Sequence, residues 1–177
     1  MFTNEQNGGN FMQSYTEYKV NEELPGIVIL SHGALAVGLV DTVKMLFGDP
    51  ENVAAFSLEA GDDIDQYRKT FAKTFESFPE GSIILADLYG GTPCNQVLLY
   101  AQESGKALKL VCGVNLPMLL NVIISREADK DGLVEAALDN GKAGITDVDV
   151  AGFIAAADDD DEDDEDDDFE DCGDFDI

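Results

Sequence analysis

Basic residues and histidine are scarce in this chain of 177 residues. It has 10 Lys and Arg against 37 Asp and Glu, and its single histidine is His32. Binding to nucleic acid depends on neutralising phosphates with Lys and Arg, and membrane surfaces are anionic as well. The charge balance therefore argues against a nucleic acid partner and against direct docking on lipid.

Long apolar runs and regularly spaced cysteines are also absent. The apolar runs are much shorter than the roughly 20 residues that cross a bilayer, and the polar N-terminus does not resemble a secretory signal. The three cysteines are Cys94, Cys112 and Cys172. An odd number of cysteines without metal-ligand spacing is typical of reduced thiols. We therefore expect a cytoplasmic protein without a metal or cofactor, in which Cys94 and Cys112 are small core residues.

Acidic residues are concentrated at the C-terminus. The chain has a net charge of -27, and residues 158–177 contain fifteen acidic side chains and no basic ones. Such runs repel themselves and stay unfolded. We expect a loosely ordered N-terminal extension at 1–24, one domain at 25–155 and a disordered acidic tail at 156–177.

The middle of the chain alternates short apolar runs with segments of helical periodicity. Apolar runs bounded by turn residues are typical of buried parallel strands, whereas apolar residues spaced by three or four predict helices. Predicted strands lie at 26–31, 53–58, 82–87 and 108–112, and predicted helices at 34–47, 64–78, 92–103, 117–126 and 129–140. A partly alternating segment at 145–150 indicates an edge strand.

This alternation predicts an α/β fold with a doubly wound, mainly parallel sheet. Right-handed crossovers leave few topologies, and we expect the flavodoxin-like strand order 2-1-3-4. In that order the first and third strands are neighbours at the switch point. Ligand chemistry in such sheets lies just beyond the carboxyl ends of the strands there.

Polar residues follow both of these strand ends. The first strand leads into His32 and the third into Asp87. Near neutral pH an imidazole is largely an unprotonated nucleophile, so one ring nitrogen can attack phosphorus. Asp87 is the candidate to orient the other nitrogen, by the logic of a catalytic triad. The pair predicts a phosphohistidine site.

A bound phosphoryl group also needs hydrogen-bond donors. Gly33 lies at the start of a predicted helix, where free N–H groups favour an anion. Gly90, Gly91 and Thr92 offer further amides and a hydroxyl in a turn without bulky side chains. Neither loop contains Lys or Arg, which suits a carrier that must release its cargo.

Each of these signals has a simpler explanation. A lone histidine at a strand end is often a polar residue with a satisfied partner, and an aspartate after a strand is often a helix cap. The Gly-Gly-Thr-Pro sequence is also a common start of a helix, with Thr92 as its N-cap. Only their convergence at adjacent strand ends favours a functional site.

At these residues the chain resembles the IIA component of the mannose family of phosphotransferase systems. The resemblance covers about residues 26–150. It is carried by Ile27-Val-Ile-Leu-Ser-His-Gly33, by Glu51-Asn-Val53 with the turn at Gly61, by Asp87-Leu-Tyr-Gly-Gly-Thr-Pro-Cys-Asn95 and by Gly113-Val-Asn-Leu-Pro-Met-Leu119. The third segment is similar to the family's Asp-x-x-Gly-Gly-Ser/Thr-Pro-Phe-Asn signature, with Cys94 in place of the usual Phe.

The resemblance implies that His32 accepts phosphoryl from the small histidine-containing phosphocarrier protein and passes it to a IIB component. That component serves sugar uptake through membrane IIC and IID components. Asp87 would orient His32, and Thr92 would hydrogen-bond near the phosphoryl group. The family implies a homodimer with an exchanged C-terminal strand, for which 145–150 is the candidate. No IIB unit follows in this sequence, so we expect IIB to be a separate chain.

Two other functions remain open. One is a regulatory phosphocarrier that serves a dihydroxyacetone kinase or a transcription regulator, although kinase-linked relatives generally lack the Gly-Gly-Thr-Pro-x-Asn signature. The other is a flavodoxin-like module that binds a nucleotide or flavin. The first β–α turn has neither Gly-x-Gly-x-x-Gly nor a Walker lysine motif, which counts against the second.

Overall fold

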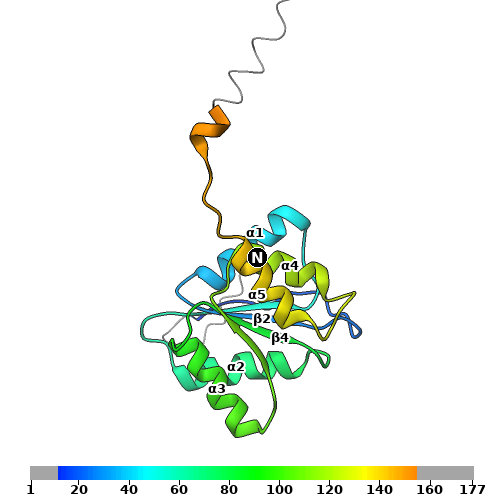
Figure 1. Cartoon of the computed structure of the whole chain (residues 1–177). Helices are drawn as coiled ribbons and strands as arrows, with labels where there is room; N and C mark the ends of the chain where they lie inside the picture. The colour runs from blue at the N-terminus through cyan, green and yellow to red at the C-terminus, as the bar shows by residue number, and fades with distance from the viewer. Residues whose placement is uncertain (1–11, 155–177) are drawn as a thin grey trace, which may run out of the picture. The chain divides into compact units, whose positions relative to one another are not determined.

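Five strands form one sheet in the order β1-β3-β2-β4-β5. The computed structural model describes residues 12–154, and Figure 1 shows the path of the chain. The strands are β1 (Gln13–Tyr15), β2 (Ile27–His32), β3 (Val53–Leu58), β4 (Ile83–Ala86) and β5 (Lys109–Cys112). All neighbouring pairs are parallel except β1 and β3. The α/β class with a mainly parallel sheet is confirmed.

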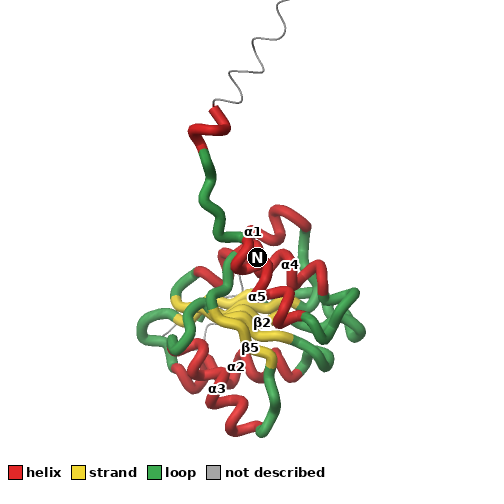
Figure 2. The backbone as a smooth tube through the Cα atoms, viewed as in Figure 1, coloured by secondary structure: helices red, strands yellow, loops and turns green. Residues whose placement is uncertain are grey.

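Helices cover both faces of the sheet, as Figures 1 and 2 show. They are α1 (Leu35–Phe47), α2 (Ile64–Glu76), α3 (Thr92–Ser104), α4 (Leu116–Ser125) and α5 (Leu133–Ala143). Strand side chains alternate between two faces. Ile27 and Ile29 of β2 therefore pack with α1, α4 and α5, whereas Val28 and Leu30 pack with α2 and α3. Both faces of β2 are thus buried, which fixes the position of its carboxyl end.

The N-terminal extension is more ordered than expected. Residues 1–11 lie outside the described part, but β1 pairs with β3, and Asn52 holds the segment that follows β1. The Asn52 amide donates to the Lys19 carbonyl (3.0 Å), and its side chain donates to the Leu24 carbonyl (2.7 Å). It also accepts from the Asn21 amide (2.9 Å). The prediction of a loosely ordered segment is therefore wrong for residues 12–24, because their partners are distant in the sequence.

The expected edge strand at 145–150 is not formed in this chain. Residues 145–149 have no regular structure, and a short helical segment follows at 150–154. The side chains of Ile145 and Val148 are exposed. A strand needs a neighbouring strand for its backbone groups, and the five-stranded sheet of the described residues does not include this segment. The end of the predicted domain at 155 and the acidic tail at 156–177 lie outside those residues.

None of the helices within residues 12–154 is long and apolar enough to span a membrane.

Candidate functional site

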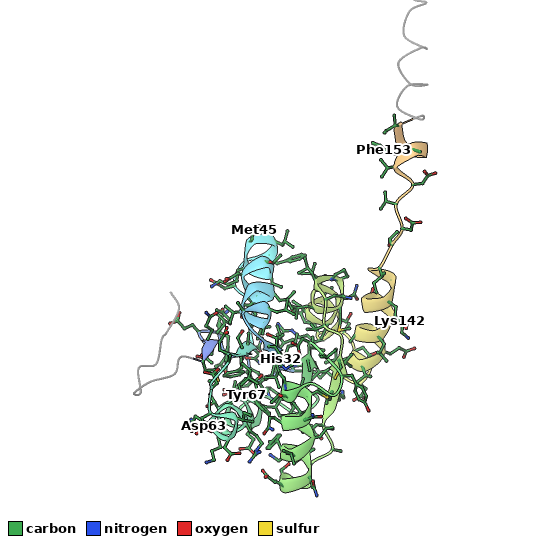
Figure 3. All side chains as sticks on the ribbon, turned by 90° about the vertical axis from the view of Figure 1, so that its left-hand side faces the viewer. His32, Met45, Asp63, Tyr67, Lys142 and Phe153 are labelled. Atoms are coloured by element: carbon green, nitrogen blue, oxygen red, sulfur yellow. The ribbon has the colours of Figure 1, made fainter. Side chains whose placement is uncertain are left out.

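His32 and Asp87 meet at the carboxyl ends of the two central strands. His32 is the last residue of β2 and is followed by the short loop that leads into α1 (Figure 3). Asp87 directly follows β4. His32 Nδ1 lies 2.9 Å from Asp87 Oδ2, and the His32 amide donates to the same oxygen at 2.8 Å. The side chain of His32 is 44 % exposed and that of Asp87 is 12 % exposed. A fixed carboxylate therefore holds a histidine that solvent and partners can reach.

The Asp87 carboxylate is itself fixed by backbone groups. Its Oδ1 accepts from the Leu88 amide at 2.7 Å, and the Asp87 carbonyl accepts from the Gly113 amide at 3.2 Å. An ionised carboxylate can only accept hydrogen bonds. Nδ1 of a neutral His32 must therefore carry the hydrogen, which leaves the lone pair on Nε2. This arrangement can direct nucleophilic attack through Nε2.

Gly91 lies against the His32 ring. A Cβ atom at this position would lie 2.7 Å from His32 Cε1 and 3.2 Å from the Leu88 carbonyl oxygen. The backbone of Gly91 has φ -69°, which any residue can adopt. The glycine is therefore required for space beside the imidazole and not for its backbone conformation.

The other predicted phosphoryl ligands surround this pair, but their amides are not all free. The Gly33 amide donates to the Leu58 carbonyl (2.9 Å) and the Gly91 amide to the Leu88 carbonyl (3.2 Å). The amides of Gly90 and Thr92 and the Thr92 hydroxyl make no hydrogen bond within residues 12–154. These three donors lie at the N-terminus of α3, where an anion is favoured.

Thr92 is the first residue of α3, and the N-cap is Gly91. The expected N-cap at Thr92 is therefore wrong by one residue. The difference matters for the site, because a capping threonine would use its hydroxyl on the helix. Here that hydroxyl remains available.

Two supporting residues did not emerge as site residues from the sequence. Ser31 is fully buried, and its Oγ accepts from the Ala36 amide at 2.7 Å, which satisfies the first turn of α1. Asn95 donates through Nδ2 to the Gly90 carbonyl at 2.9 Å and so braces the loop beside His32. The sequence offers one signal for each residue: serine is a common capping residue just before a helix, and asparagine is a common residue beside a glycine turn.

Tyr67 lies in the core beneath the site. It is 1 % exposed, and its hydroxyl donates to the Phe56 carbonyl at 3.3 Å. Burial raises the pKa of Tyr67, and the charge of Asp87 raises it further. Tyr67 therefore stays neutral and adds no charge to the site.

The described residues contain no group of three or more His, Cys, Asp or Glu side chains placed to hold a metal ion. The chemistry available at this site is that of the imidazole, the carboxylate and the donors at the N-terminus of α3.

The chain is similar to known components of sugar phosphotransferase systems. Residues 26–138 match the family model described as the PTS system fructose IIA component. The chain is 32% identical over 125 residues to the mannose-specific EIIAB component of Escherichia coli (strain K12), covering 67% of this chain and 38% of that protein. It thus spans well under half of that relative. It is 30% identical over 103 residues to the fructose-specific EIIA component of Bacillus subtilis (strain 168), covering 57% of this chain and 70% of that protein.

A solved structure shares the fold. The phosphotransferase system component EIIA from Streptococcus agalactiae superposes with a TM-score of 0.65 at 28% identity, covering 70% of this chain and 97% of that one. The residues matched by the family model include β2, which ends at His32, and β4, which Asp87 follows. The chain belongs to the mannose family of IIA components of the sugar phosphotransferase system.

Proposed function

We propose that His32 carries the phosphoryl group, accepting it from the histidine-containing phosphocarrier protein and passing it to a IIB component. The observation that carries this proposal is the 2.9 Å contact between His32 Nδ1 and Asp87 Oδ2. In the first transfer the Nε2 lone pair attacks phosphorus, a bond forms between phosphorus and Nε2, and the bond from phosphorus to the donor histidine breaks. The second transfer repeats these changes with Nε2 as the leaving group.

Asp87 acts as the positioning and charge-balancing group. When Nε2 bonds to phosphorus, the imidazole becomes positively charged, and its Nδ1–H then donates to a full carboxylate. A hydrogen bond between charged groups is shorter and about twice as strong as a neutral one. Asp87 therefore stabilises the phosphorylated ring more than the free ring.

The donors at the N-terminus of α3 hold the phosphoryl oxygens. The amides of Gly90 and Thr92 and the Thr92 hydroxyl supply partial positive charge, while the loops that carry them contain no Lys or Arg. Dipolar donors stabilise the phosphoryl group less than a full counter-charge would. This balance supports reversible transfer between two protein partners, as a carrier requires.

The acceptor distinguishes a transport role from a regulatory one. In the transport role the phosphoryl group passes to IIB in the cytoplasm and then to sugar that enters through IIC and IID. In the regulatory role the acceptor would be a kinase or a transcription regulator. The Escherichia coli relative is described as a mannose-specific EIIAB component, and this name favours the transport role.

The test is intact mass spectrometry after incubation with phosphoenolpyruvate, enzyme I and the phosphocarrier protein. We expect one acid-labile phosphoryl group on the parent chain and none on His32→Ala. Addition of IIB should then remove the group from the parent chain. A parent that stays unmodified, or a His32→Ala variant that is still phosphorylated, would refute the assignment of His32.

We also propose that the chain acts as a homodimer in which residues 145–150 pair with β5 of a second copy. β5 is the last strand of the sheet order, so one of its edges has no partner among the described residues. Ile145, Val148 and Val150 are exposed apolar residues in a segment that the sheet of the described residues does not include, and they would supply the apolar side chains of the added strand. Light scattering should give a dimer for the parent and a monomer after removal of residues 145–177. A dimer that survives the truncation would contradict this proposal.

A further inference from the structure

Two thiols from different elements face each other next to the candidate site. Cys94 lies in the first turn of α3, and Cys112 is the last residue of β5. Their Sγ atoms are 3.5 Å apart. Cys94 is 1 % exposed, whereas Cys112 is only partly buried. Solvent therefore has a route to the pair through Cys112.

Both cysteines belong to the backbone that positions the site. Cys112 is paired in register with Ala86, the residue before Asp87, and the next amide along, that of Gly113, donates to the Asp87 carbonyl. Cys94 follows Thr92 by two residues within the same helical turn. A movement of either thiol is therefore transmitted to Asp87 or to the donors of α3.

We propose that Cys94 and Cys112 are a redox modification site, and that a disulfide between them slows phosphoryl transfer at His32. The second half of this proposal rests on the function proposed above. A disulfide has an S–S length of about 2.05 Å, so the two sulfur atoms must approach by roughly 1.5 Å. That approach draws the first turn of α3 toward β5 and moves Thr92 and Gly91 relative to the His32 ring.

The oxidant that fits this site is a small hydroperoxide. The sulfur of Cys112 attacks hydrogen peroxide, the O–O bond breaks, and a sulfenic acid and one water molecule form. The sulfur of Cys94 then attacks the sulfenic sulfur, the S–S bond forms, and the S–O bond breaks with release of a second water molecule. Two thiols and one peroxide thus give one disulfide and two waters. A dithiol reductant reverses the oxidation.

The resting state is the dithiol. Burial, and then the contact with Cys94, raise the pKa of Cys112 to about 12. The thiolate is the reactive form, so little of it is present near neutral pH. We therefore expect the pair to respond to sustained peroxide and not to brief exposure.

The test uses the full chain with Cys172→Ser, which leaves these two thiols alone. After treatment with hydrogen peroxide, intact mass should show the loss of two hydrogens, and N-ethylmaleimide added to the urea-unfolded chain should modify neither cysteine. Phosphorylation of His32 should fall at least tenfold and recover with dithiothreitol. The same chain with Cys112→Ser is the matched control and should keep its rate after the same treatment and reduction.

A second readout does not depend on phosphoryl transfer. His32 is the only histidine, so its imidazole resonances are unambiguous by NMR, and they should shift between the dithiol and disulfide forms. Free thiols after peroxide, or covalent dimers in place of an internal bond, would overturn the disulfide. A complete disulfide with unchanged His32 resonances would overturn its coupling to the site. If the dithiol form is also not phosphorylated while the resonances still shift on oxidation, the result counts against the proposed function alone.

Discussion

Replacement of Gly91 by Ala tests whether the position of the His32 ring controls the chemistry. The new Cβ would lie 2.7 Å from His32 Cε1, whereas carbon atoms in contact are at least about 3.5 Å apart. The ring must therefore withdraw by roughly 0.8 Å. A shift of this size away from Asp87 would extend the 2.9 Å contact beyond hydrogen-bond length. Misplacement of a reacting group by about 1 Å costs about 10²-fold in rate.

The same substitution should leave stability nearly unchanged. Alanine adopts φ -69° without strain, and replacing a glycine at a compatible position stabilises a protein by about 0.4–1 kcal/mol through the unfolded state. The close approach to the Leu88 carbonyl offsets part of this gain. We therefore expect a loss of transfer without a loss of folding, which a general disruption would not produce.

Two quantities are measured for each variant and compared with the parent chain. The first is the rate of phosphorylation by the phosphocarrier protein, monitored by intact mass, and the second is the midpoint of urea unfolding. Gly38→Ala is the matched control, because Gly38 lies on the exposed side of α1 with nothing within 4 Å of an added Cβ. It should transfer at the parental rate. A Gly91→Ala protein that also transfers at that rate would refute the reasoning that the ring position is set by this contact.

Three further perturbations separate the site from the scaffold. Asp87→Asn should keep the fold but slow transfer about 10²- to 10⁴-fold, measured as above, because the charge that holds the His32 tautomer is lost; a parental rate would contradict this role. Arg126→Met should lower the free energy of unfolding in urea by about 2–4 kcal/mol, because the carbonyl oxygens of Pro25 and Glu51 lose their donors, with no change in transfer per folded molecule. Labelling of Cys112 by N-ethylmaleimide, resolved by peptide mass, should rise about tenfold per pH unit from pH 8 to 11, and a plateau near pH 9 would contradict the raised pKa. The unfolded chain loses this thiol proton at a lower pH than the folded chain does. The free energy of unfolding should therefore fall as the pH rises above 9.

The elements with local signals were predictable from the sequence. The apolar run after Gly26 and the helical spacing from Leu35 identify β2 and α1 because each element buries its own pattern of side chains. The meeting of His32 and Asp87 followed from one rule about parallel sheets, since carboxyl ends of neighbouring strands lie at one edge. Local periodicity and one topological rule therefore predicted which two residues meet at the centre of the candidate site.

Features that depend on distant partners were not predictable. The three residues of β1 obtain their hydrogen bonds from β3, and the sequence around Gln13 contains no periodicity that shows this. The lack of room for a Cβ at Gly91 beside the His32 ring depends on how α3 packs at the sheet edge. The sequence predicted Cys94 and Cys112 as core residues, which is right for Cys94, whereas Cys112 is only partly buried. The contact between the two sulfur atoms could not be predicted.

The contacts of Asn52 have a consequence for where this protein can be cut. The match to the family model begins at residue 26, but the partners of the Asn52 backbone amide and of its side chain all precede that residue. A fragment designed from the shared region alone would bury an amide side chain with nothing to bind, at a cost of about 1–3 kcal/mol for each group left unsatisfied. The hydrogen bonds and strand pairing of this fold extend beyond the residues that the family model matches, so an expression fragment should start no later than residue 12.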